Sequence, residues 1–354
     1  MNILFVDDEP NILRGLRRTL RANRNRWSMY FAEGAREALK VLDDQRVDVL
    51  VTDMRMPGLS GKDLAIRLKE RHPEVLCIGL TGYCKPKENL DSPSLFHQFW
   101  SKPARQDFMV SHLERIEESA ENMEPEHRRW LSGLRNLPAD LTVRQKLVKE
   151  LNAVCPDYAE LKELTKGDIG LHAKLVQIGS TSFCGPVADE RHCDVSALLR
   201  DEIGRQLFSQ EGLFALQNTS ELQALSQNSR RCSQRAQALA ESAGAPGWVV
   251  ECASAGAHLA GLSELVCLPE ESPFCPTDKS SCHKACRFLL AVWGVNPRLC
   301  QAVEGALKPN EELSDGSRPE HFTSLAALSL DPGNRRPFVD SQLRVWGIER
   351  PWKD

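Results

Sequence analysis

The sequence predicts a multidomain protein in which an α/β domain with a doubly wound, five-stranded parallel sheet precedes an all-α domain. In the first part of the chain, short apolar runs alternate with stretches of helical periodicity, as is typical of a parallel sheet covered by helices. From residue 137 onward, apolar residues recur at helical spacing and no alternating strand pattern of any length appears. We therefore expect an α/β domain over 1–118, a helical linker over 119–136 and an all-α domain over 137–354.

The elements of the α/β domain follow from these patterns. Apolar segments at 2–6, 28–32, 47–51, 75–80 and 97–101 are expected to be the strands. Helical periods predict helices at 10–21, 35–42, 59–71 and 104–134, the first with Pro10 in its first turn. The residues expected to point inward are Leu64, Ile66 and Leu68 in the third helix and Phe108, Val110, Leu113 and Ile116 in the fourth.

Polar side chains stand at the ends of four of these strands. Asp7 and Asp8 follow the first strand, Asp53 follows the third, and Thr81 and Lys102 follow the fourth and fifth. Ligands bind at the carboxyl ends of strands in an open parallel sheet, so these groups are expected to meet. Carboxylates suit Mg²⁺, and an Asp nucleophile with a Lys, a hydroxyl and Mg²⁺ is what phosphoryl transfer requires.

The order and spacing of these residues resemble the receiver domain of two-component response regulators, over about the first third of the chain. The resemblance implies a flavodoxin-like fold with Asp53 as the phosphoacceptor, phosphorylated by a partner histidine kinase. It also implies a magnesium site of Asp7, Asp8 and Asp53, with the Arg55 backbone carbonyl as a further protein ligand.

The same resemblance implies a conformational switch formed by Thr81 and Phe99, the aromatic residue three positions before the lysine. One segment departs from the receiver pattern. Between residues 83 and 96, where receivers have a fourth helix, Pro86 and Pro93 argue against a helix of full length. That region often mediates dimerisation in receivers, so receiver-mediated dimerisation is placed in doubt while a homodimer stays open.

Two charged segments in this part of the chain each allow two interpretations. The helix at 104–134 turns acidic towards its end, which favours a solvated linker over a signalling helix between dimer partners. A run of arginines near the first helix favours a solvated face, with a partner contact left open. Its members are Arg14, Arg17, Arg18, Arg21, Arg24 and Arg26.

The helical part is similar to an HDOD domain over about 137–335. The similarity rests on Leu137-Pro138, on the stretch from Gly167 to Gly185 that ends in Phe183-Cys184-Gly185, and on a late helix around Trp293-Gly294. The resemblance implies a non-catalytic output domain that regulates a downstream signalling protein, not identified by the sequence, through protein–protein contact.

HDOD domains are related to HD-type metal phosphohydrolases, which require His and His-Asp ligands on different helices. The corresponding positions here are Asn228 or Ser229, His258-Leu259 and Ala306-Leu307, and only His258 is of ligand type. The chain is therefore not expected to be an enzyme. A cyclic-nucleotide phosphohydrolase and a nucleotide- or nucleic-acid-binding output are the alternatives. Metal binding by Cys275, Cys282, His283 and Cys286 is left open, with buried thiols preferred.

Composition sets further bounds on the 354-residue chain. The net charge is −4, so no overall basic field points to nucleic acid. No apolar run approaches the ~20 residues of a membrane span. The sequence starts with a core strand, which leaves no room for a signal peptide, and the 12 cysteines are expected to be reduced thiols in a cytoplasmic protein.

Overall fold

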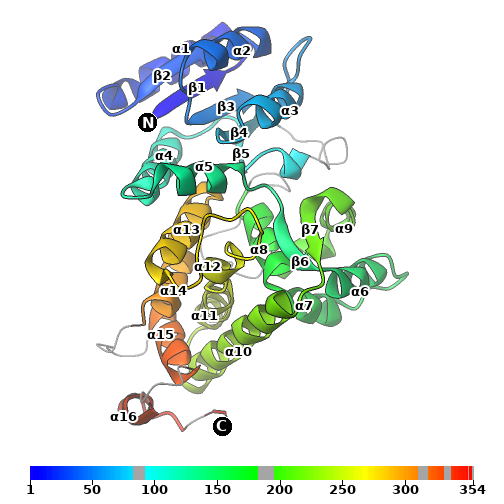
Figure 1. Ribbon diagram of the computed structural model, residues 1–354, viewed down its shortest axis with the longest axis vertical. Helices are drawn as coiled ribbons and strands as arrows, with labels where there is room; N and C mark the ends of the chain where they lie inside the picture. Colours follow the sequence, from blue (N-terminus) through cyan, green and yellow to red (C-terminus); the bar gives the residue numbers. More distant parts are fainter. Residues whose placement is uncertain (83–91, 182–194, 310–317, 331–335, 350, 353–354) are drawn as a thin grey trace.

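The structure is a computed structural model that describes residues 1–82, 92–181, 195–309, 318–330, 336–349 and 351–352. Its N-terminal part is a five-stranded parallel sheet, as predicted, and the strands lie in the order β2-β1-β3-β4-β5. The strands are β1 (Asn2–Val6), β2 (Ser28–Ala32), β3 (Val49–Asp53), β4 (Leu76–Thr81) and β5 (Gln98–Ser101). Figure 1 shows this sheet and its helices at one end of the molecule, above the helical region.

Helices cover both faces of the sheet because successive strand residues point to opposite sides. Ile3 and Phe5 pack with α1 (Pro10–Thr19) and α4 (Gln106–Ala120). Leu4 and Val6 pack with α2 (Ala35–Asp44) and α3 (Gly61–Arg71). The predicted inward orientation is wrong for two residues. Ile66 is 38% exposed and Phe108 is 42% exposed, since each lies on the solvent side of its helix.

The single helix predicted over 104–134 is two helices. After α4 the chain breaks at Asn122, which has a left-handed φ of 58°, and α5 (Pro125–Gly133) starts with proline in its first turn. In the predicted irregular segment at 83–96, residues 83–91 lie outside the described residues, and Ser92–Ser94 form a single 3₁₀ turn.

The remainder of the chain is largely helical, but the all-α prediction is wrong in one detail. The four-residue strands β6 (Leu137–Asp140) and β7 (Phe214–Gln217) form a parallel pair. The helices are α6 (Leu141–Leu151), α7 (Tyr158–Lys166), α8 (Ile169–Gly179), α9 (Glu202–Phe208), α10 (Ser220–Ser242), α11 (Gly247–Leu259), α12 (Leu262–Leu265), α13 (Lys279–Val292), α14 (Pro297–Leu307), α15 (Pro319–Leu330) and α16 (Arg336–Val345).

The two regions share their cores. One hydrophobic cluster runs from Ile3 and Phe5 in the sheet to Phe288 and Trp293 in and after α13, and a second joins the other face of the sheet to α6–α9. No helix in the described part of the chain has the length and apolarity needed to cross a bilayer.

Candidate functional site

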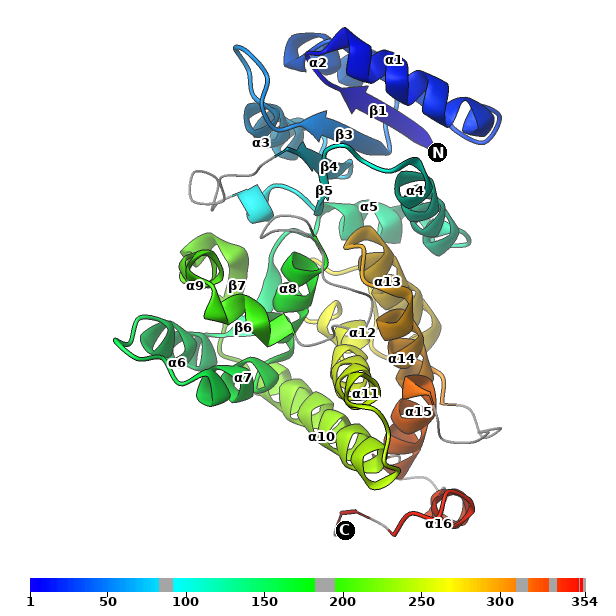
Figure 2. The same cartoon turned by 180° about the vertical axis from the view of Figure 1, so that it is seen from behind.

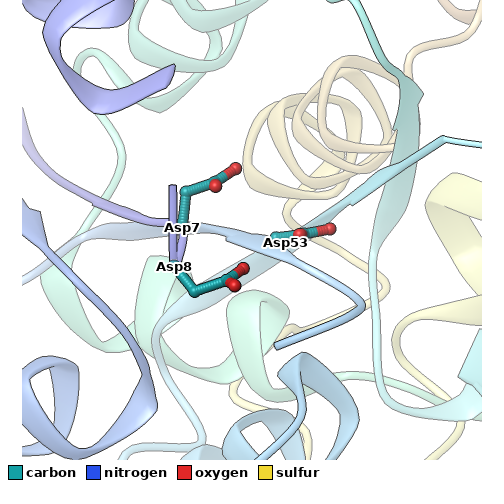
Figure 3. Close-up of side chains that lie close together, drawn as sticks. All are labelled: Asp7, Asp8 and Asp53. Atoms are coloured by element: carbon teal, nitrogen blue, oxygen red, sulfur yellow. The ribbon is translucent and has the colours of Figure 1, made fainter. Parts of the chain in front are cut away.

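Three carboxylates meet at the carboxyl end of the sheet. Asp7 and Asp8 follow β1 and Asp53 ends β3, and an oxygen from each lies within 4.8 Å of the others. Figure 3 shows the three side chains gathered at this edge. Asp7 is fully buried and Asp53 is 8% exposed. A cluster of carboxylate oxygens open to solvent on one side fits the ligand preference of Mg²⁺, so the donor set present suits the predicted ion.

Lys102 joins this cluster from the segment after β5. Its Nζ lies 2.7 Å from Asp7 Oδ2 and 2.9 Å from Asp53 Oδ2. Partial burial alone lowers the pKa of Lys102, but the hydrogen bonds and charges of the two carboxylates outweigh burial, and the pKa is raised. Lys102 is therefore held as a cation directly beside Asp53.

The loop after Asp53 requires a glycine at the start of α3. A Cβ on Gly61 would lie 2.0 Å from the Asp53 carbonyl oxygen, so only glycine allows this approach. The Asp53 Oδ1 accepts a hydrogen bond from the Arg55 backbone N–H at 3.3 Å. The Arg55 carbonyl as a metal ligand stays a prediction.

Thr81 and Phe99 lie on the adjacent strands β4 and β5. Thr81 is buried and pairs in register with Ser101, and its carbonyl accepts a hydrogen bond from the Lys102 backbone N–H at 2.7 Å. Phe99 is buried against Gly79, where a Cβ would come within 2.8 Å of the Phe99 ring. The structure thus places Thr81 next to Lys102 of the carboxylate cluster and Phe99 on the adjacent strand, while their role as a switch stays a prediction.

A clasp between the regions, formed by Gln98 of β5, His112 of α4 and the turn at Gly294, was not predicted. Gly294 follows α13 with φ +72°, and a Cβ there would lie 1.8 Å from Gln98 Nε2 and 2.7 Å from His112 Cε1. Gln98 Oε1 accepts a hydrogen bond from Trp100 Nε1 at 2.9 Å. The Trp293-Gly294 turn singled out in the sequence is therefore seated on the receiver-like sheet edge.

A buried polar cluster lies at the other end of β5. His97 Nδ1 accepts a hydrogen bond from the Cys77 N–H at 2.8 Å, and Arg135 contacts His97 Nε2. Lys174 of α8, fully buried, donates to the Arg135 carbonyl at 2.9 Å, and Gln177 donates to the His97 carbonyl at 3.3 Å. Burial, with Arg135 and Lys69 adding positive charge, lowers the pKa of Lys174 to about 7.

In the helical region, His258 is fully buried and its ring stacks on His172, with ring centroids 4.7 Å apart. Neither His258 nitrogen has a hydrogen-bond partner among the described residues. Burial, with the nearby charges of His172 and Lys166, lowers the pKa of His258 well below its usual range. Ser254, four residues before His258 on α11, hydrogen-bonds to Ser233 of α10 at 2.9 Å.

The cysteines considered as a possible metal site differ in exposure, and one of them has a neighbour that the sequence did not suggest. Cys282 and Cys286 are buried and Cys275 is exposed. The sulfur of Cys282 lies 3.4 Å from that of Cys267, a neighbour 15 residues earlier that spacing did not single out. Within the described ranges, the set of three or more metal-type side chains that meet is Asp7, Asp8 and Asp53.

A family model for the response regulator receiver domain matches residues 3–114. The hydrogenase transcriptional regulatory protein HoxA of Cupriavidus necator is 38% identical over 81 residues, which cover 23% of this chain and 16% of that protein. The transcriptional regulatory protein GlrR of Escherichia coli is 29% identical over 121 residues, which cover 34% of this chain and 27% of that protein.

Among solved structures, the signal receiver domain of an HD domain-containing protein from Pseudomonas fluorescens is 26% identical, with a TM-score of 0.31. The alignment covers 33% of this chain and 94% of that one. The N-terminal region is a response regulator receiver domain of two-component systems. The chain spans well under a third of the length of the two regulators, and the matched region ends at residue 114.

Proposed function

We propose that this chain is a response regulator whose receiver accepts a phosphoryl group on Asp53 from a sensor histidine kinase in the cytoplasm. The observation that supports this most is the position of Lys102, whose amine lies 2.9 Å from the Asp53 carboxylate and 2.7 Å from Asp7. A carboxylate next to a cation and two further acids is equipped to receive phosphate.

In the proposed reaction, an Asp53 oxygen attacks phosphorus, and the bond to the phosphohistidine nitrogen breaks with its electron pair going to that nitrogen. An acyl phosphate on Asp53 results. Lys102 neutralises one phosphoryl oxygen and the Thr81 hydroxyl binds another. Asp7, Asp8 and Asp53 would hold Mg²⁺, which supplies further charge neutralisation when bound.

The path to the helical region runs through β5. Phe99 lies between Gln98 and Trp100, and Gln98 is pressed against Gly294 of the clasp. A movement of Thr81 and Phe99 towards the phosphoryl group would shift this strand. We infer that the helical region reads phosphorylation through the clasp, within the same chain, and that this use of β5 and α4 takes the place of receiver dimerisation.

The helical region is proposed to be an HDOD-like output that regulates a partner protein by contact, without catalysis. Two observations support this. Leu259 stands where a His-Asp pair would need an acid, and the His258 ring is fully buried against His172. A metal-dependent phosphohydrolase needs an accessible ion with an open position for water.

Phosphorylation of the purified full chain with a small-molecule phosphodonor and Mg²⁺ tests the receiver function. Intact-mass spectrometry is expected to show one added phosphoryl group on the wild type and on the control Asp44→Asn, an exposed acid of α2, and none on Asp53→Asn. Hydrogen exchange is expected to change at β5 and at residues 293–295 on phosphorylation. Phosphate on Asp53→Asn would overturn the assignment.

Metal analysis of the same protein tests the non-catalytic output. We expect no transition metal retained by residues 137–354 after dialysis. Stoichiometric metal that is lost in His258→Leu, together with hydrolysis of a cyclic nucleotide, would replace the non-catalytic proposal with the hydrolase alternative.

A further inference from the structure

Helix α1 carries its charge on one side. Leu13, Leu16 and Leu20 pack against the sheet on the inner side. The outer side and the 3₁₀ turn that follows (Leu20–Asn23) form what we call the arginine stripe, because residues three and four positions apart share a helix face. The stripe consists of Arg14, Arg17, Arg18, Arg21 and Arg24, all exposed.

The fold does not neutralise the stripe. Arg26, next to the stripe, forms an ion pair with Glu114 at 2.6 Å and also contacts Glu117. The charge of Arg26 is therefore balanced by carboxylates of the fold. By contrast, the side chains of Arg18, Arg21 and Arg24 make no ion pair or hydrogen bond to any described residue. Like charges three and four positions apart destabilise a helix, so the stripe is a cost to the fold.

Helix electrostatics explain only part of the stripe. Arg17 and Arg18 lie in the last turn of α1, where cations interact favourably with the helix dipole. Arg14 lies earlier in α1, and Arg21 and Arg24 follow its end. These residues have no such role in the fold.

The surface around the stripe is a shallow hollow of about 780 Å³. Its charged lining consists of Arg18, Arg21 and Arg24, and its neutral polar lining includes Asn25 and Gln106 of α4. Among the described residues, no carboxylate lines it. Figures 1 and 2 show α1 at the end of the molecule opposite the helical region, so that region does not cover it.

We propose that the arginine stripe binds the phosphate backbone of nucleic acid without reading its sequence. Guanidinium groups bind phosphates in a bidentate manner, and Asn and Gln side chains commonly contact the same oxygens. Although the chain carries a net charge of −4, binding of this kind depends on the local field.

Two observations favour nucleic acid over an acidic protein. Protein interfaces centre on large apolar or aromatic anchors. The large apolar side chains that the described part of the chain exposes all lie outside residues 10–25. The stripe also lacks exposed aromatics for stacking on unpaired bases, so duplex backbone is the expected ligand.

Fluorescence anisotropy of the unphosphorylated full chain with a labelled duplex DNA of arbitrary sequence, at several salt concentrations, tests this. The variant Arg18→Gln/Arg21→Gln/Arg24→Gln is expected to bind at least about ten-fold more weakly and to lower the salt slope by roughly 2 to 3, since each phosphate contact contributes about 0.9. The control Arg36→Gln/Arg67→Gln/Arg71→Gln removes the same charge from exposed positions of α2 and α3 and is expected to bind like the wild type.

Asp53→Asn is also expected to bind normally, which separates this proposal from the phosphorylation proposal. Absence of DNA binding at low salt would overturn the proposal, and so would an equal loss in the control variant. Binding to polyglutamate or to anionic lipid vesicles in place of DNA, lost in the triple variant, would identify a different partner and overturn the nucleic-acid assignment.

Discussion

The receiver and the helical region each gather polar side chains in their interior, but the two clusters differ in charge balance and in access. In the receiver, Asp7 and Asp53 face the amine of Lys102 at an edge open to solvent. In the helical region, the imidazoles of His172 and His258 stack in the core. Opposite charges that reach solvent can exchange ligands, whereas two stacked rings in the core contribute mainly packing. The comparison teaches that exposure and charge balance, as well as residue type, distinguish the two clusters.

The largest effect is expected from a substitution that breaks the clasp between the two regions. Gly294→Ala places a Cβ 1.8 Å from Gln98 Nε2 in a left-handed conformation, so we expect about 3 kcal/mol of lost stability from strain and overpacking. Gly347→Ala has the same kind of φ, +67°, but open space around it, and is expected to lose about 1 kcal/mol. Denaturant unfolding measures both, and equal losses would contradict the clasp.

The charge balance of the receiver site is tested by Lys102→Met. Asp7, fully buried, then loses its cation, and we expect about 2 kcal/mol of lost stability in EDTA, less than the 3–5 kcal/mol of a fully buried pair because Lys102 reaches solvent. Added Mg²⁺ should restore much of it. Lys40→Met on α2 is the control, and thermal unfolding is the measurement. A loss that Mg²⁺ does not reduce would argue against a metal site.

The buried polar cluster around His97, Arg135 and Lys174 should make the stability of the protein depend on pH. The pKa of Lys174 is about 7 in the fold, below its unfolded value of ~10.4, so the unfolded chain binds more protons. Stability from this group is therefore lost as the pH falls, by about 1 kcal/mol between pH 8 and pH 6. Lys174→Met removes the hydrogen-bond donor to the Arg135 carbonyl, which lowers stability at every pH. In unfolding experiments from pH 6 to pH 8, the variant should show a smaller change of stability with pH than the wild type. An unchanged slope would show that another group causes it.

The smallest effect is expected at the histidine pair. His258→Leu removes an imidazole without hydrogen-bond partners in the described part of the chain, so stability should change by less than about 1 kcal/mol. Leu259→Ala, the adjacent buried residue, should lose about 2–4 kcal/mol. If His258→Leu were the more damaging of the two in denaturant unfolding, His258 would have a partner that packing does not account for.

The receiver fold and site could be predicted because their signals are local. Each strand is a short apolar run, and Asp7, Asp53, Thr81 and Lys102 directly follow or end such runs. Strand ends meet at one edge of a parallel sheet, so sequence order alone brings these residues together. The strand at Ser28–Ala32 has the predicted bounds.

The features that sequence missed depend on contacts between distant segments. β6 and β7 are four-residue strands that pair across a long separation, and neither is long enough to show alternation. The contacts of His97 with Arg135, and of Gln98 with Gly294, arise only when the helical region docks. The helix break at Asn122 is a different case, because Pro125 three residues later marks the first turn of a new helix and could have been read from the sequence.

The clasp also affects the outer edge of the sheet, which is formed by β5. β5 is an outer strand, and outer strands expose backbone groups that can pair with another chain. Here Gln98, Phe99 and Trp100 are all buried, and Gln98 lies directly against the Gly294 turn of the helical region. A fragment ending near residue 118 would uncover this edge, so it is expected to self-associate in size-exclusion chromatography while the full chain does not. Self-association of the fragment alone would indicate that the helical region protects this edge of the sheet from pairing with another chain.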